Sequence, residues 1–203
     1  MSLKEIHISI FGEKETPKLD LIRDYLKSKN ISEIKPKPGR LAFDFNSIKV
    51  KIYEFSELPE KKRSKDIPNN QCIIIIFDMT KRQSFIDILD KWIKYLREMK
   101  YVNQIILFGI GNKDELIMTD DKEINYLIEI TNIKGKFHDL RSMDKDAICK
   151  LIDKLIVEIF EKAQNNCYKI FKREKSADHF KKKPNLRQKI QNFFNEFGYY
   201  DTN

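Results

Sequence analysis

The sequence has little of what disulfide-bonded, metal-binding or membrane-spanning proteins rely on. Its three cysteines, Cys72, Cys149 and Cys167, are odd in number and widely spaced, so we expect neither disulfides nor a thiolate metal site. The three histidines are scattered and show no metal-ligand spacing. No apolar run approaches the roughly 20 residues of a membrane span. From these absences we expect a cytoplasmic protein. A place in a cytoskeletal or other large assembly is compatible with that expectation.

Most of the chain also has little excess positive charge, and the excess that is present lies mainly in the last 42 residues. The chain has 39 Lys and Arg against 31 Asp and Glu, a net charge of +8. Residues 162–203 hold ten basic and four acidic residues, or +6, which leaves 29 basic and 27 acidic residues, or +2, in residues 1–161. We therefore divide the chain into a near-neutral domain, 1–161, and a basic helical extension, 162–203. The extension could meet an acidic protein surface, an anionic membrane or nucleic acid.

Strand-sized apolar segments recur through the first 161 residues. They are Glu5–Phe11, Arg40–Phe45, Ile48–Phe55, Cys72–Asp78, Gln104–Gly109 and Lys136–Leu140. A continuous apolar run such as 73–77 is typical of a parallel strand covered on both faces. The alternating pair around Asn46 and Ser47 predicts an antiparallel hairpin at a sheet edge.

Amphipathic patterns predict helices between these strands. They cover 19–26, 85–96, a third stretch that begins near Asp120 with Glu123 three residues later, and a fourth from Ile148 to about residue 175. Because strands and helices alternate, the sequence predicts an α/β doubly wound sheet.

The segment Gly-Glu-Lys-Glu-Thr-Pro-Lys-Leu, which starts at Gly12, has half of the phosphate-binding pattern GxxxxGK[ST]. Gly12 and Lys18 have the correct spacing, but Pro17 replaces the second glycine and Leu19 replaces the hydroxyl residue. Proline has no N–H to donate to a phosphate, and leucine cannot bind Mg²⁺. The Thr16-Pro pair is also an ordinary helix start, with Thr as N-cap and Pro at the first helical position. Both interpretations stay open at this point.

Three more segments follow this loop in a fixed order. They are Lys51-Ile-Tyr-Glu-Phe-Ser-Glu-Leu-Pro59, Ile75-Ile-Phe-Asp-Met-Thr-Lys-Arg-Gln-Ser-Phe85 and Ile106-Leu-Phe-Gly-Ile-Gly-Asn-Lys-Asp-Glu-Leu116. With the loop, they resemble the motifs of the Ras superfamily, and within it of Rab-like small GTPases, over residues 4–161. The resemblance implies a P-loop NTPase-type doubly wound sheet, the small GTPase fold, with about six strands and five helices before the basic extension.

The resemblance also implies which residues would bind a nucleotide. Gly12 and Lys18 match the phosphate loop, where the lysine would meet a β- or γ-phosphate. Asn112 and Lys113 match the guanine motif, and Glu115 stands where an aspartate would pair with the base. These five residues are our candidate cofactor-binding set.

Other functional positions of the family are altered. Glu54 replaces the aspartate that supports the metal, Glu57 the glycine whose N–H contacts the γ-phosphate, and Leu58 the glutamine that orients the hydrolytic water. The segment Arg141–Met143 stands in place of the last base-binding loop, Ser-Ala-Lys. We therefore predict no catalytic residue and no metal site, and we expect no cofactor, although GTP or GDP stays possible.

The extension holds the predicted partner-binding residues, a lysine run followed by an apolar helical stripe. They are Lys181, Lys182, Lys183, Leu186, Ile190, Phe193, Phe194 and Phe197. Such a stripe must be buried, either on its own domain or on a partner. Rab-like proteins usually end in prenylated cysteines, whereas the last cysteine here is Cys167, so no lipid anchor is expected.

Three functions are compatible with these patterns. The favoured one is a catalytically inactive small-GTPase-fold protein that acts as an interaction module or structural subunit of a larger assembly. The second is a GTP/GDP switch with weak or Mg²⁺-independent binding and little intrinsic hydrolysis. The third is a nucleic-acid or membrane-surface adaptor that works through 181–183. No interleaved aromatics or RNA-binding motif accompany that run, so nucleic acid is not favoured as a partner.

Overall fold

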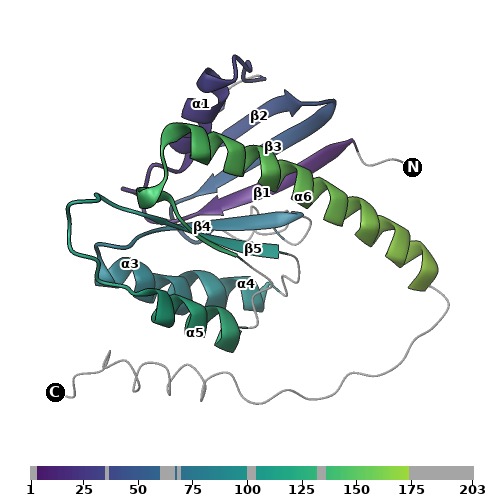
Figure 1. Cartoon of the computed structure of the whole chain (residues 1–203). Coiled ribbons are helices and arrows are strands. Elements are labelled where there is room, and N and C mark those ends of the chain that lie inside the picture. Colours follow the sequence, from purple (N-terminus) through teal and green to yellow (C-terminus); the bar gives the residue numbers. More distant parts are fainter. Residues whose placement is uncertain are drawn as a thin grey trace.

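The computed structural model describes residues 4–34, 37–59, 67, 70–99, 104–131 and 136–173, with side chains described up to residue 165. They form a six-stranded sheet between two helical layers (Figure 1). The strands are β1 (Glu5–Phe11), β2 (Arg40–Phe45), β3 (Ile48–Phe55), β4 (Cys72–Asp78), β5 (Gln104–Ile110) and β6 (Phe137–Asp139). The predicted α/β fold is confirmed. The last strand is shorter than expected, because the chain turns into a 3-10 helix, η3 (Leu140–Ser142), directly after Asp139.

The sheet order brings the loops of several strands to one edge. The order is β2-β3-β1-β4-β5-β6, with β2 antiparallel to β3 and every other neighbouring pair parallel. The predicted hairpin turns at Asn46 and Ser47, whose φ angles of 46° and 67° suit a two-residue type I′ turn. The loops after β1, β3, β4 and β5 therefore leave the sheet at the edge on the left of Figure 1, where open α/β sheets bind ligands.

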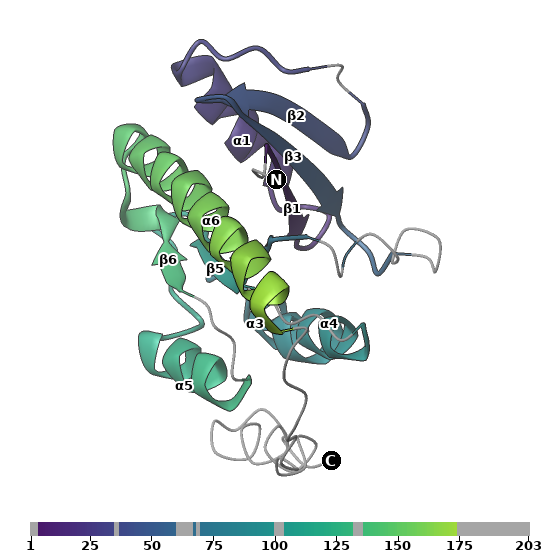
Figure 2. The same cartoon turned by 90° about the vertical axis from the view of Figure 1, so that its right-hand side faces the viewer.

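Helices cover both faces of this sheet. One layer consists of α1 (Lys18–Ser28) and α6 (Lys145–Arg173). The other consists of α3 (Arg82–Asp87), the π-helix η2 (Ile88–Ile93), α4 (Lys94–Glu98) and α5 (Asp121–Thr131). Figure 2 shows α1 and α6 above the second layer. Each layer buries its own core cluster against the sheet, centred on residues such as Ile22 and Ile156 in the first layer and Phe85 and Trp92 in the second.

Two predictions about helix ends can be compared with the structure. Asp120 and Glu123 form the expected capping box of α5: Glu123 N–H donates to Asp120 Oδ1 (2.8 Å) and Asp120 N–H to Glu123 Oε2 (3.1 Å). The last helix continues to Arg173, close to the expected residue 175. The eight predicted partner-binding residues, from Lys181 to Phe197, lie outside the described residues. None of the helices within the described ranges is long and apolar enough to cross a membrane.

Candidate functional site

The five predicted nucleotide-binding residues lie on two loops at the carboxyl edge of the sheet. Gly12 directly follows β1 and Lys18 opens α1, whereas Asn112, Lys113 and Glu115 follow β5. Only β4 separates β1 from β5 in the sheet, so the topology places both loops at the same edge. In the described part of the chain, however, no hydrogen bond or ion pair joins one loop to the other. Each loop is mainly bonded to its own neighbours, as follows.

Gly12 is required by packing. A Cβ atom at this position would lie 2.6 Å from the carbonyl oxygen of Ile76 and 2.7 Å from Oγ1 of Thr16. The N–H of Gly12 donates to the carbonyl of Phe55 (3.2 Å). The glycine that matches the phosphate motif therefore allows β1, β3 and β4 to approach each other, and its N–H is already used within the sheet.

The loop between Gly12 and α1 folds back on itself. The carbonyl of Glu13 accepts hydrogen bonds from Thr16 N–H (3.2 Å), Thr16 Oγ1 (2.7 Å) and Lys18 Nζ. Pro17 has φ −78° and ψ 62°, and Lys18 N–H donates to the carbonyl of Thr16 (2.8 Å), which together form an inverse γ-turn. Pro17 thus occupies the N-cap position of α1, so the expected helix start with Thr16 as N-cap is wrong. In this turn, Pro17 has no N–H and that of Lys18 is already bonded.

The ammonium group of Lys18 is enclosed by the loop that precedes it. Lys18 is 1% exposed, and its Nζ donates to the carbonyl of Glu13, to the carbonyl of Thr16 (3.3 Å) and to Thr16 Oγ1 (3.2 Å). Glu54 Oε1 lies 3.7 Å from the same nitrogen. Burial lowers the pKa of Lys18, and the charge of Glu54 opposes that shift. The chain's own oxygens therefore surround the group that would meet a phosphate.

Leu19 occupies the position of the family's Mg²⁺-binding hydroxyl residue. Its side chain is 4% exposed and belongs to the core cluster beneath α1 and α6. Glu54, which replaces the metal-supporting aspartate, lies beside Lys18. These residues do not fit a magnesium ion, because one is apolar and buried and the other neutralises a buried cation. Within the described ranges, no group of three or more His, Cys, Asp or Glu side chains could hold a metal.

A cavity of about 620 Å³ lies beside this loop. Its lining residues are Lys14, Gly39, Glu54, Phe55, Ser56, Glu57, Leu58 and Pro59. The charged part of the lining is one lysine against two glutamates, and Leu58 is 47% exposed. Burial and the nearby carboxylates of Asp87 and Glu15 also raise the pKa of Glu13 in the adjoining loop. This part of the edge is acidic and would repel a phosphate group.

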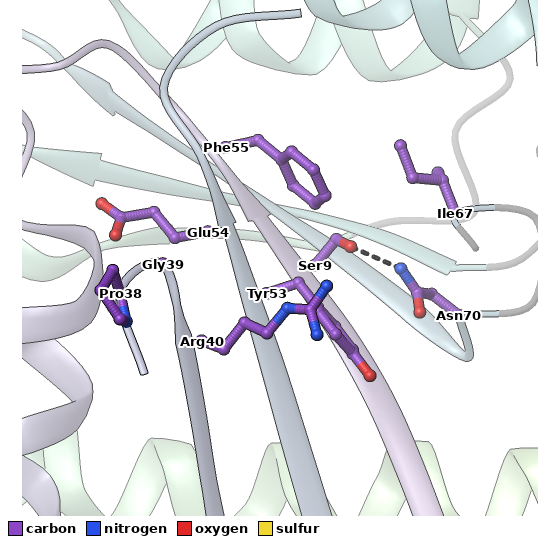
Figure 3. Close-up of a pocket in the computed structure, with 9 residues that line it drawn as sticks. All are labelled: Ser9, Pro38, Gly39, Arg40, Tyr53, Glu54, Phe55, Ile67 and Asn70. Atoms are coloured by element: carbon purple, nitrogen blue, oxygen red, sulfur yellow. Dashed lines mark hydrogen bonds between the residues drawn. The ribbon is translucent and has the colours of Figure 1, made fainter. Parts of the chain in front are cut away.

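A smaller cavity, about 30 Å³, lies on the neighbouring part of β3 and is large enough for a water molecule. Figure 3 shows its lining, with Glu54 and Phe55 on opposite sides of the strand and Asn70 directed at Ser9. The Asn70 amide donates to the Ser9 hydroxyl. This cavity is too small for a nucleotide, and it shares Gly39, Glu54 and Phe55 with the larger cavity.

The loop after β5 is open to solvent. Asn112, Lys113 and Glu115 are all exposed. Asn112 Oδ1 accepts a hydrogen bond from Asp114 N–H (3.2 Å), and the Asn112 carbonyl accepts one from Glu115 N–H (3.3 Å). The three predicted residues are therefore brought together with one another and remain available for contact.

Arg141 packs beside this loop. A Cβ atom at Gly111 would lie 3.3 Å from Cδ of Arg141, whose side chain is 8% exposed. Its Nη2 lies 2.9 Å from Asp139 Oδ2 and its Nε 3.1 Å from Oδ1. Burial would raise the pKa of Asp139, but the hydrogen bonds from Arg141 outweigh it and lower that pKa. The sequence marked Arg141 as a departure from Ser-Ala-Lys but gave no signal that Asp139 would hold it.

A second ion pair that the sequence did not reveal fixes the end of the loop. Arg82 at the start of α3 binds both carboxylate oxygens of Glu123, at 2.8 and 2.6 Å, and donates to the carbonyl of Met118 (2.6 Å). Arg82 and Glu123 are 41 residues apart in the chain. In the loop itself, shortly before Glu123, the side chains of Leu116, Ile117 and Met118 are 80%, 46% and 43% exposed. The far end of the loop is thus held to α3 and α5.

Comparisons with known proteins agree with the α/β fold. The model of the Ras family matches residues 54–177. The chain is 28% identical over 141 residues to the Ras-related protein RabV of Dictyostelium discoideum, an alignment that covers 65% of this chain and 57% of RabV. The chain therefore spans a little over half the length of that relative. The family match begins at Glu54, so it includes Asn112, Lys113 and Glu115 but not the loop from Gly12 to Lys18.

Proposed function

This chain belongs to the Ras family, and we propose that it is a catalytically inactive, Rab-like member of that family. In this proposal it serves as a protein-interaction module or structural subunit of a larger assembly in the cytoplasm. Its partners are other proteins, and its basic extension meets an acidic surface. It needs neither a bound nucleotide nor a metal ion for this role.

The observation that carries the proposal is the closed loop before α1. In a working phosphate loop, backbone N–H groups and the lysine ammonium point at the phosphates. Here Lys18 N–H is bonded to Thr16, and the Lys18 ammonium is bonded to Glu13 and Thr16 and lies beside Glu54. A phosphate would have to displace these contacts and enter an edge that carries several glutamates. Each displaced contact reduces the affinity for a nucleotide.

Two further replacements bear on hydrolysis. Leu58 stands where the family's glutamine orients the attacking water, and its side chain is apolar and 47% exposed. Glu57 lines the same cavity and brings a negative charge to the region where a γ-phosphate would lie. A nucleotide that did bind would therefore lack both its water-positioning group and a favourable field for the developing charge.

The second candidate, a weak GTP/GDP switch, is favoured by one observation. Asn112 and Lys113 are exposed and lie at the same edge as the cavity of about 620 Å³. In that function, they would bind guanine, and Glu115 would replace the base-pairing aspartate. Binding would then depend on the base more than on the phosphates.

Mass spectrometry of the nucleotide released from the purified full-length chain separates the two candidates. The proposal expects no guanine nucleotide above trace amounts in this measurement. In a second measurement, of phosphate release from added GTP, it expects no Mg²⁺-dependent turnover above that of buffer. Lys18→Ala serves as the matched variant, and it should leave both measurements unchanged. Stoichiometric GDP or GTP, or a Mg²⁺-dependent turnover that Lys18→Ala abolishes, would favour the switch.

A further inference from the structure

Strands β2, β3 and β1 present nine side chains, all polar except Ala42, on the side of the sheet away from α1. The strand register places them in three rows of three, namely Arg40, Tyr53 and Ser9; Ala42, Lys51 and His7; and Asp44, Lys49 and Glu5. All except Ser9 keep exposed surface. Helices of the second layer pack on β4, on β5 and on Phe11 and Phe55 at the ends of β1 and β3, and none of the helices in the described ranges covers the three rows. We call this surface, together with Lys37, the cationic face.

The cationic face has more positive than negative groups. A hollow of about 270 Å³ on it is lined by Lys37, Arg40, Lys49, Lys51 and Tyr53, with Ile34, Leu41, Ala42 and Ile52. Lys51 is paired with Glu5, since Nζ and Oε1 are 2.7 Å apart. Over the residues that the structure describes, Lys37, Arg40 and Lys49 form no ion pair. Asp44 is the other acid of this face and lies opposite Lys49 in the register, but no ion pair joins the two in the described residues. Three cations around one hollow therefore have no carboxylate bound to them.

Aromatic rings hold part of this face in place. The Arg40 guanidinium lies 5.4 Å from the centre of the Tyr53 ring, and Figure 3 shows the two side chains next to each other. The His7 ring stacks on Tyr53 with 5.8 Å between ring centres, and Tyr53 Oη lies 3.3 Å from His7 Nδ1. These contacts restrict the arginine before any partner arrives, which lowers the entropy cost of binding.

The backbone at the outer edge of β2 is already used by the chain. Ile34 N–H donates to the carbonyl of Ala42 (2.6 Å), and Arg40 N–H donates to the carbonyl of Lys37 (3.1 Å). An added strand would have to displace this segment. A partner is therefore recognised here by side chains, and the charge of the face decides which side chains it carries.

We propose that the cationic face binds an acidic segment of a partner protein, whose carboxylates meet Lys37, Arg40 and Lys49. The chain's own basic extension is excluded as the occupant by its charge, since residues 162–203 carry a net +6. This inference rests on the proposed function, because a partner segment on the cationic face presupposes that the chain acts as an interaction module. It is independent of whether the loops at the carboxyl edge hold a nucleotide.

Nuclear magnetic resonance of the ¹⁵N-labelled full chain, titrated with a short glutamate-rich peptide, tests the proposal. Shift changes should gather on Lys49, Lys51 and Tyr53, and the glutamine version of the peptide should cause none. The double variant Arg40→Glu with Lys49→Glu should raise the Kd about tenfold. The control, Lys122→Glu with Lys150→Glu, makes the same change in net charge on α5 and α6 and should leave the Kd unchanged.

Several outcomes would overturn the proposal. They are shift changes that gather on residues 162–203, equal weakening in the control, or tighter binding to phosphatidylserine vesicles than to the peptide. If the charge-reversed variant does not fold, Arg40→Gln with Lys49→Gln removes the same two cations and should weaken binding in the same direction. Co-purified nucleotide in the same sample would count against the inactive-GTPase proposal and leave this one standing.

Discussion

At the scale of single residues, a residue can match the phosphate-loop motif and still serve packing instead of phosphate binding. Gly12 matches the phosphate loop, yet its lack of a side chain is needed by the backbone of Ile76. Lys18 also matches, yet its ammonium is bonded to the chain itself. Spacing alone predicted both positions. What they contact depends on how β3 and β4 approach the loop, which no pattern within residues 12–19 contains.

Replacing Gly12 therefore tests packing directly. We expect Gly12→Ala to lower the free energy of unfolding by about 1–3 kcal/mol, because the new Cβ would lie 2.6 Å from a carbonyl oxygen of β4. Urea unfolding followed by circular dichroism measures the effect. Lys14→Ala in the same loop is the control, since Lys14 is exposed, and it should change stability by much less. Equal stability of Gly12→Ala and the wild type would contradict the packing argument.

The Arg82–Glu123 pair gives a second prediction at this scale. Arg82→Met should lower the free energy of unfolding by about 1–3 kcal/mol, because the Glu123 carboxylate, 8% exposed, would lose a two-point partner. The control is Lys27→Met, which removes an exposed pair with Asp24 and should cost about 0–1 kcal/mol. Thermal unfolding of both variants decides the matter, and the argument fails if the two lose equal stability.

At the scale of helices and strands, the sequence predicted most of the fold. Buried strands such as β4 were found at their expected bounds, because a run like 73–77 is apolar on both faces. The π-helix η2 was not predicted, since residues such as Phe85, Leu89 and Trp92 fit a regular helix equally well. The inverse γ-turn at Pro17 was also missed, because proline fixes φ but leaves ψ to the surroundings.

The junction of β6 and η3 predicts a dependence on pH. Arg141 holds the pKa of Asp139 below its ordinary value of 3.8, so the ionised carboxylate stabilises the folded state. This contribution is fully present above about pH 4 and is lost as the pH falls through the lowered pKa. Asp139→Asn keeps the size of the side chain, so it should be less stable than the wild type at neutral pH. The difference should shrink below pH 3.8.

Urea unfolding of Asp139→Asn at several pH values measures that difference. Asp144→Asn is the control, because Asp144 caps α6 through Ala147 N–H and forms no ion pair within the described residues. A difference between wild type and Asp139→Asn that stays constant down to the acid limit would show that the Arg141 pair is not its source.

At the scale of the whole molecule, the two ends of the chain differ from its centre. The family match begins at Glu54 and the closed loop lies before it, whereas most of the excess charge lies after residue 161. The central sheet keeps the family's architecture. The protein of the proposed interaction role thus combines two parts. One is a near-neutral domain with an altered phosphate loop, and the other is an extension that is basic and rich in phenylalanine.

The extension gives the last prediction. Its apolar residues Phe193 and Phe197 recur at helical spacing and must be buried on a partner or on the domain. If they dock on a partner, Phe193→Asp with Phe197→Asp should abolish capture of that partner from extract while the melting temperature stays unchanged. Gln188→Asp with Asn192→Asp adds the same charge away from the apolar stripe and should preserve capture. A fall in melting temperature with capture intact would instead place the stripe on the chain's own domain.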